Sequence, residues 1–92
     1  MPMPLDEFIF DDHSELGERY RYKFANGYGA SVVMNQYTYG GLMGLWELAV
    51  LRFDPIDSDR WELCYTTPVT NDVLGYLNET ELKIALKRIQ EL

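Results

Sequence analysis

Two copies of the tripeptide Trp-Glu-Leu, at residues 46–48 and 61–63, most restrict the folds open to this chain. Each copy lies in a short run of aromatic and β-branched residues, and an aspartate-rich segment, residues 54–59, separates the two runs. Such runs joined by a polar segment predict a β-hairpin. A buried tryptophan removes about 200 Å² from water. We therefore expect both tryptophans on one face of this hairpin, with Phe53 opposite Arg60.

A second hairpin is predicted upstream, because residues 18–24 alternate strictly between two kinds of side chain. One side carries Tyr20, Tyr22 and Phe24, and the other carries Arg19, Arg21 and Lys23. Asn26-Gly27 follows, and this pair favours a two-residue type I′ turn. The returning strand then covers residues 28–35 and places Tyr20 opposite Val33.

The middle of the chain carries weaker signals. Residues 36–44 contain three glycines, which indicates a flexible loop or a bulged strand entry. Residues 45–53 are apolar at both parities, which is typical of a central strand covered on both faces. A fourth strand is expected over residues 60–66, and a short helical turn over residues 70–75.

The C-terminal helix has the clearest local signature. Asn78 is the expected N-cap, Glu81 completes a capping box, and Leu77 with Leu82 forms a hydrophobic staple. An apolar stripe at helical spacing follows: Leu82, Ala85, Leu86, Ile89 and Leu92. The sequence thus predicts an α+β fold: an antiparallel sheet of about four strands, in two consecutive hairpins, with this amphipathic helix on one face. We expect one domain, residues 17–92, preceded by an acidic arm, residues 1–16.

Charge narrows the possible partners. Fifteen acidic residues against eight basic ones give a net charge of −7, so we expect no direct binding to nucleic acid. The single cysteine cannot form an intramolecular disulfide, and no leader-like segment opens the sequence. The longest apolar run, residues 42–53, is too short and too charged to span a membrane. These features predict a cytoplasmic protein.

No constellation of residues indicates catalysis, a metal or a cofactor. His13 lies among acids, Cys64 has no histidine nearby in sequence, and the aspartates of residues 54–59 fit turn chemistry better than a calcium loop. Glu47 and Glu62 would lie on one sheet face but more than about 10 Å apart, which is too far for a retaining glycosidase pair and marginal for an inverting one. We expect a protein that is not an enzyme and that holds no cofactor.

Two segments are candidates for contact with a partner. Nine residues make up these segments: Phe8, Ile9, Phe10, Asp11 and Asp12 in the arm, and Tyr37, Tyr39, Leu42 and Met43 in the glycine-rich loop. Loops that carry apolar side chains often recognise partners, although both segments could instead close the ends of the core. The basic stripe of residues 19–23 is more often a solvated strand face than a binding surface.

Three stretches carry a resemblance to known proteins: residues 28–33 (YGASVV), 44–50 (GLWELAV) and 61–77 (WELCYTTPVTNDVLGYL). Together they resemble a group of small uncharacterised proteins encoded by bacteriophages and prophages. The resemblance covers about the last two-thirds of the chain and supplies no catalytic or binding residues. It implies a phage setting inside a bacterial host.

The leading hypothesis is a small acidic interaction protein that binds a host or phage protein. A structural, self-assembling phage protein is the first alternative, since exposed aromatic residues could form a symmetric interface. An inhibitor that mimics nucleic-acid charge is the second, and its binding would weaken steeply with salt.

Overall fold

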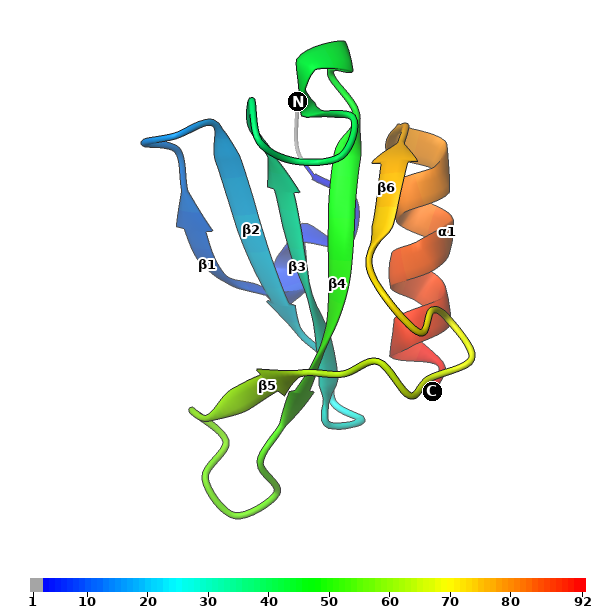
Figure 1. The fold of residues 1–92 in the computed structure, drawn as a ribbon. Helices are drawn as coiled ribbons and strands as arrows, with labels where there is room; N and C mark the ends of the chain where they lie inside the picture. The colour runs from blue at the N-terminus through cyan, green and yellow to red at the C-terminus, as the bar shows by residue number, and fades with distance from the viewer. Residues whose placement is uncertain (1–2) are drawn as a thin grey trace.

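A computed structural model describes residues 3–92 as an antiparallel sheet covered on one face by a C-terminal helix (Figure 1). The strand order is β1-β2-β3-β4-β5, and β6 pairs with a separate part of β4. The elements are η1 (Asp6–Phe8), β1 (Ile9–His13), β2 (Glu18–Lys23), β3 (Tyr28–Met34), η2 (Gly41–Met43), β4 (Trp46–Phe53), β5 (Trp61–Leu63), β6 (Leu74–Leu77) and α1 (Glu79–Gln90). The predicted α+β class and C-terminal helix are confirmed, with six strands where about four were expected.

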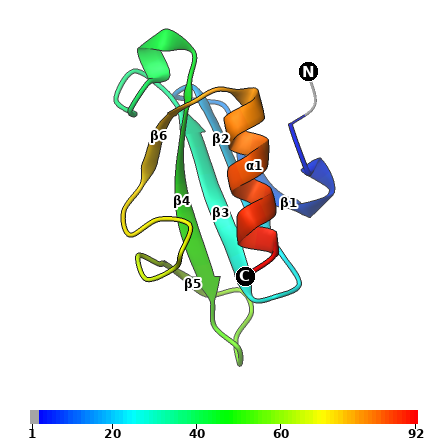
Figure 2. The same ribbon diagram turned by 90° about the vertical axis from the view of Figure 1, so that its right-hand side faces the viewer.

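The helix and the N-terminal segment cover the same face of the sheet. Helix α1 packs lengthwise against β3 and β4, and the chain around η1 lies beside it (Figure 2). Met3, Leu5 and Phe8 of this segment are partly buried against the core. The Tyr22 hydroxyl donates to the Pro4 carbonyl oxygen at 2.8 Å, and burial raises the pKa of Tyr22 so that the hydroxyl stays a neutral donor. The N-terminal segment thus completes the layer that α1 begins.

The core follows the alternation of the strands and the stripe of the helix. Inward-facing side chains come from β2, β3 and β4, and the helix contributes the predicted apolar positions. The buried core residues include Tyr22, Phe24, Ala30, Val32, Trp46, Leu48, Val50, Leu82, Ala85, Leu86 and Ile89. Cys64 is also buried in this core, where it acts as a small apolar side chain. The predicted strand over residues 60–66 had placed it on the polar face, and that placement is wrong.

Both ends of α1 are closed by side chains. At the N-terminus Glu81 N donates to Asn78 Oδ1 at 2.8 Å and Asn78 N donates to Glu81 Oε1 at 3.0 Å, which confirms the capping box. At the C-terminus the Asn26 Nδ2 amide donates to three carbonyl oxygens, those of Ile89, Gln90 and Leu92, at 2.9, 3.0 and 3.1 Å. Asn26 belongs to the β2–β3 turn, so one turn residue fixes the end of the helix.

The first hairpin has a register one residue away from the predicted one. Tyr20 pairs with Val32 instead of Val33. Phe24 N donates to Tyr28 O at 2.8 Å, which leaves a three-residue loop that ends at Gly27 with φ +85°. Because Asn26 keeps a negative φ, the type I′ turn is wrong and a three-residue turn with left-handed glycine replaces it. The alternation of β2 itself is confirmed.

The second hairpin is also shifted by one residue. Phe53 pairs with Trp61 instead of Arg60. A one-residue shift moves every side chain to the other face, so Trp46 lies in the core while Trp61 lies on the face that α1 leaves open. The expectation that both tryptophans share one face is wrong. The same shift places Glu62 opposite Arg52, so Glu62 no longer shares the open face with Glu47. The carboxylate pair considered from the sequence is therefore not formed.

Three segments differ from the predicted elements. Residues 9–13, expected in the arm, pair with β2 as an edge strand with an irregularity between Ile9 and Asp11. The fourth strand ends at Leu63, and residues 74–77 form β6 on β4 where a helical turn was expected. Within residues 3–92 no helix has the length and apolar character needed to cross a membrane.

Candidate functional site

The glycine-rich loop is a series of hydrogen-bonded turns that ends in η2. The Thr38 hydroxyl accepts from Asn35 N and donates to Asn35 O, each at 3.0 Å. Met43 N and Leu45 N both donate to Gly40 O, at 2.9 and 3.0 Å, and Gly40 has φ +90°. A side chain on Gly41 would collide with the Asn35 carbonyl oxygen. The loop therefore has a defined conformation and is not a bulged strand entry.

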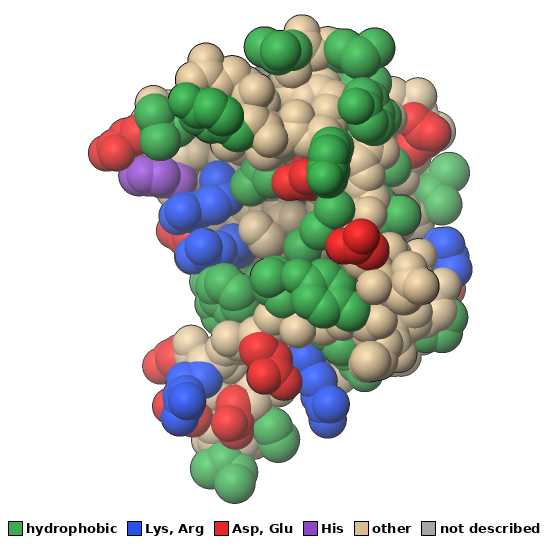
Figure 3. Space-filling model, viewed as in Figure 1, with side chains coloured by type: hydrophobic (Ala, Val, Ile, Leu, Met, Phe, Trp, Pro, Cys, Tyr) green, Lys and Arg blue, Asp and Glu red, His purple; other side chains and the backbone are tan. Residues whose placement is uncertain are grey.

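This loop presents large apolar side chains to solvent at one end of the sheet. Tyr37 is 82% exposed, Leu42 85% and Met43 70%. Leu16, in the β1–β2 turn, lines a shallow recess of about 230 Å³ together with Tyr37, and Tyr76 of β6 donates its N–H to Tyr39 O at 3.2 Å. We call this surface the apolar end; it comprises Leu16, Tyr37, Tyr39, Leu42, Met43 and Tyr76. In Figure 3 hydrophobic side chains lie in several separate groups across the top of the molecule.

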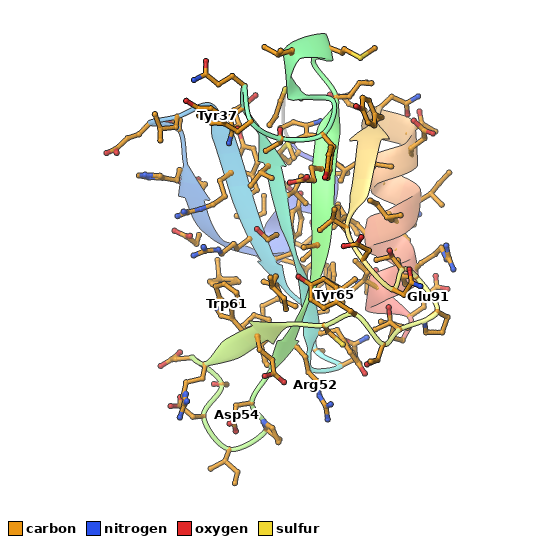
Figure 4. All side chains as sticks on the ribbon, viewed as in Figure 1. Tyr37, Arg52, Asp54, Trp61, Tyr65 and Glu91 are labelled. Carbon is orange, nitrogen blue, oxygen red and sulfur yellow. The ribbon has the colours of Figure 1, made fainter. Side chains whose placement is uncertain are left out.

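The structure does not bring the candidate residues of the arm to the apolar end. Phe8 contacts Phe24 with ring centroids 5.2 Å apart, and Ile9 packs against the core. Phe10 is half-exposed and contacts Phe53, 5.7 Å between centroids. Phe53 ends β4 beside the β4–β5 loop, and Figure 4 shows Tyr37 at the opposite end of the sheet from Asp54. Asp12 is exposed on the edge strand.

The basic stripe of β2 contacts other elements of the fold. Asp11 Oδ2 accepts from Arg19 at 3.0 Å and from Arg21 at 3.3 Å. The Arg21 guanidinium also lies 4.8 Å from the Trp61 ring centroid, and Lys23 Nζ donates to Ser58 O at 2.8 Å. These contacts tie β1 and the β4–β5 hairpin to β2, which supports the structural interpretation of the stripe.

Replacing Asp11 with asparagine is expected to lower the free energy of unfolding by about 1 kcal/mol, because it leaves two guanidinium groups without their shared anion. The three side chains are about one-quarter to one-third exposed, so solvent screens the interaction. Urea denaturation measures the loss, which should shrink in high salt. Asp12→Asn, on the adjacent exposed acid, is the matched control; an equal loss in both variants would contradict the prediction.

A larger recess lies beside the apolar end, between the N-terminal segment, the sheet and the start of α1. It has a volume of about 460 Å³. Its apolar lining consists of Met3, Met34, Leu45 and Trp46, and two carboxylate side chains, Glu18 and Glu79, also line it. Glu18 Oε1 accepts from the Tyr20 hydroxyl at 2.8 Å, and this bond raises the pKa of Tyr20.

The charges around the apolar end are mainly negative. Glu15 lies in the turn beside Leu16, and Glu47 Oε1 accepts from Tyr39 N at 3.4 Å. Glu18 and Glu79 line the recess, whereas Arg19, the base next to Glu18, is bound to Asp11. On the face drawn in Figure 3, Lys and Arg side chains lie below the apolar end. The apolar end is therefore an apolar surface bordered mainly by acidic side chains.

The β4–β5 loop shows the predicted turn chemistry. Asp54 Oδ1 accepts from Ile56 N at 2.8 Å and from Asp57 N at 3.1 Å, and these bonds lower the pKa of Asp54. A recess of about 360 Å³ beside this loop is lined by Phe53, Trp61 and charged side chains. His13 lies 3.5 Å from Glu15 at the exposed edge. Within residues 3–92, no three His, Cys, Asp or Glu side chains are grouped to hold a metal ion.

Leu16, Tyr76 and the recess residues were absent from the candidates drawn from the sequence. Leu16 precedes Gly17, which has φ +98° in the β1–β2 turn, and Tyr76 belongs to β6. The sequence offered one sign for Leu16, a hydrophobic residue beside a turn glycine. Using that sign requires residues 9–13 to be recognised as a strand. No protein-family model, curated protein or solved structure matches this chain.

Proposed function

We propose that this chain is a non-catalytic interaction protein that binds a protein partner through its apolar end. The observation that carries the proposal is the gathering of six exposed large apolar side chains on a loop, a turn and a short strand at one end of the sheet. Monomeric proteins seldom leave such groups together without a use, and apolar surface rimmed by polar groups is typical of binding sites. Tyrosine and methionine are also enriched at protein interfaces.

The order of the loop supports the same function. Its turns are fixed by the hydrogen bonds of Asn35, Thr38 and Gly40, so little conformational entropy remains to be lost when a partner binds. The resemblance to proteins of bacteriophages and prophages suggests that the partner is a host or phage protein. A second copy of this chain is the alternative occupant.

The double substitution L42D/M43D is expected to weaken partner binding at least about a hundredfold, because it places two charges where apolar contacts would form. Both side chains are exposed at 70% or more, so the fold should tolerate the change. Ile56→Asp is the matched control, since Ile56 is 96% exposed in the β4–β5 loop, far from the apolar end.

The measurement is photo-crosslinking in the bacterial host from a reactive residue placed at position 37 or at position 56, since Tyr37 is also exposed at the apolar end. A discrete crosslinked protein at position 37 that is lost in the L42D/M43D background, kept in the Ile56→Asp background and absent from position 56 would support the proposal. Equal products at both positions would contradict it. Analytical ultracentrifugation of the purified chain identifies the case in which the occupant is a second copy.

A further inference from the structure

The recess lined by Glu18 and Glu79 combines two kinds of lining. Met34, Leu45 and Trp46 supply apolar atoms, and the two carboxylates supply negative charge. Its volume of about 460 Å³ falls in the range of about 300–1,000 Å³ usual for ligand pockets. An occupant that suits this lining has a long apolar stem and a cationic tip.

The start of α1 does not oppose a cation here. The positive end of a helix corresponds to about half an elementary charge, whereas the first turn carries the two acids Glu79 and Glu81. The backbone N–H of Glu81 is already bound by Asn78. The first turn of α1 thus brings carboxylate charge, not only the helix dipole, to the side of the recess.

On these grounds we infer that the recess receives a lysine or arginine side chain of the partner, with its stem on the apolar floor and its cation between Glu18 and Glu79. The inference rests on the proposed function and names the chemistry of the partner: a segment with apolar anchors for the apolar end and a basic residue for the recess. Lysine and arginine bury their stems against apolar surface while their charge stays near water.

Charge also favours such a partner over a second copy. A symmetric dimer through the apolar end would bring Glu15, Glu18, Glu47 and Glu79 of one protomer toward the same residues of the other. Like charges across an interface disfavour association, whereas a basic segment meets opposite charge. The net charge of −7 acts in the same direction.

The test uses the full chain and three synthetic amphipathic helical peptides with the same leucine pattern, whose polar positions are lysine, arginine or glutamate. Binding is followed by NMR through the indole N–H signals of the two tryptophans. Trp46 lines the recess, whereas Trp61 lies at the distant hairpin and serves as an internal control. We expect the two basic peptides to shift the Trp46 signal, with an affinity that falls as salt is added.

Two double variants separate the recess from general charge attraction. E18Q/E79Q is expected to weaken binding of the basic peptides about tenfold, because it removes the charge-assisted contacts. The amide oxygen that this variant introduces at position 18 remains an acceptor for the Tyr20 hydroxyl. D59N/E62Q removes the same charge from the exposed β4–β5 hairpin and should bind like the wild type. Retained folding is checked by thermal unfolding of each variant.

The outcomes distinguish this inference from the proposed function. Basic peptides that fail to bind, a glutamate peptide that binds equally well, or wild-type affinity in E18Q/E79Q would each overturn the lysine or arginine site. If L42D/M43D abolishes crosslinking to the cellular partner while E18Q/E79Q leaves it intact, the apolar end remains the interface and only the recess assignment fails. Self-association of the chain in ultracentrifugation would overturn the choice of a basic partner.

Discussion

Deletion of residues 1–13 is expected to lower the free energy of unfolding by about 4–6 kcal/mol, a large share of the roughly 5–15 kcal/mol typical of a domain. The deleted segment packs Met3, Leu5, Phe8 and Ile9 against the core. Each is partly buried, and full burial of such a side chain contributes about 1.5–3 kcal/mol. The loss of Pro4 O also leaves the Tyr22 hydroxyl without its acceptor.

Urea denaturation followed by far-ultraviolet circular dichroism measures this loss. The control keeps the segment and neutralises three of its four acids: D6N/E7Q/D12N changes acids whose side chains accept no hydrogen bond within residues 3–92. Each of these surface substitutions should alter stability by no more than about 0.5 kcal/mol. If the truncated chain were as stable as the control, residues 1–13 would be a detachable arm.

This prediction affects how a partner should be sought. Loss of binding on truncation would report unfolding as readily as loss of a contact surface, since the segment carries β1 and covers Tyr22 and Phe24. Substitutions at the apolar end avoid this ambiguity, because Tyr37, Leu42 and Met43 are exposed.

The faces of individual strands could be predicted from the sequence, but their registers could not. The alternation of β2 correctly placed Tyr22 and Phe24 in the core. Register depends on the turn, and in both hairpins the turn differs by one residue from the simplest choice. Strand β4 is apolar at both parities, with Leu48 and Leu51 both fully buried, so its pattern could not reveal the shift that separates Trp46 from Trp61.

The elements that were missed depend on contacts between distant parts of the chain. Strand β6 has four residues, contains Gly75, and is held by pairing with β4. Strand β1 has acidic residues on an outer edge and an irregular register, features that protect an edge strand and weaken its sequence signal. The exposed loop residues Tyr37, Tyr39, Leu42 and Met43 were identifiable from the sequence. Placing Leu16 requires β1, placing Tyr76 requires β6, and the recess requires the N-terminal segment and the start of α1 to pack beside the sheet.

The β2–β3 turn, which sets the register of the first hairpin, also contains the residue with the second large expected effect on stability. Asn26→Asp is expected to lower the free energy of unfolding by about 1–2 kcal/mol at neutral pH, because Asn26 is exposed and solvent moderates the loss. The amide of Asn26 donates to the carbonyl oxygens of Ile89, Gln90 and Leu92. An ionised carboxylate cannot donate, and it would face both these oxygens and the negative end of the helix.

The loss should depend on pH in a defined direction. The carbonyl oxygens disfavour the charged form of the introduced carboxyl group, so the folded state raises its pKa above the unfolded value of about 3.9. A group whose pKa is higher in the folded state than in the unfolded state stabilises the fold fully at pH values below its unfolded pKa. That contribution is lost as the pH rises through the folded pKa. The deficit of the variant relative to the wild type should therefore be smallest below about pH 4 and grow toward neutral pH.

Two controls separate the charge from the lost hydrogen bonds. Asn71→Asp makes the same chemical change at an exposed position and should leave stability within about 0.5 kcal/mol of the wild type. Asn26→Ala removes the donors, together with the Oδ1 that accepts from Tyr28 N, without adding charge, so its loss should be independent of pH. Equal losses for Asn26→Asp and Asn26→Ala at neutral pH would show that the carboxylate turns away into solvent. Equal losses would also refute the proposed conflict with the helix end.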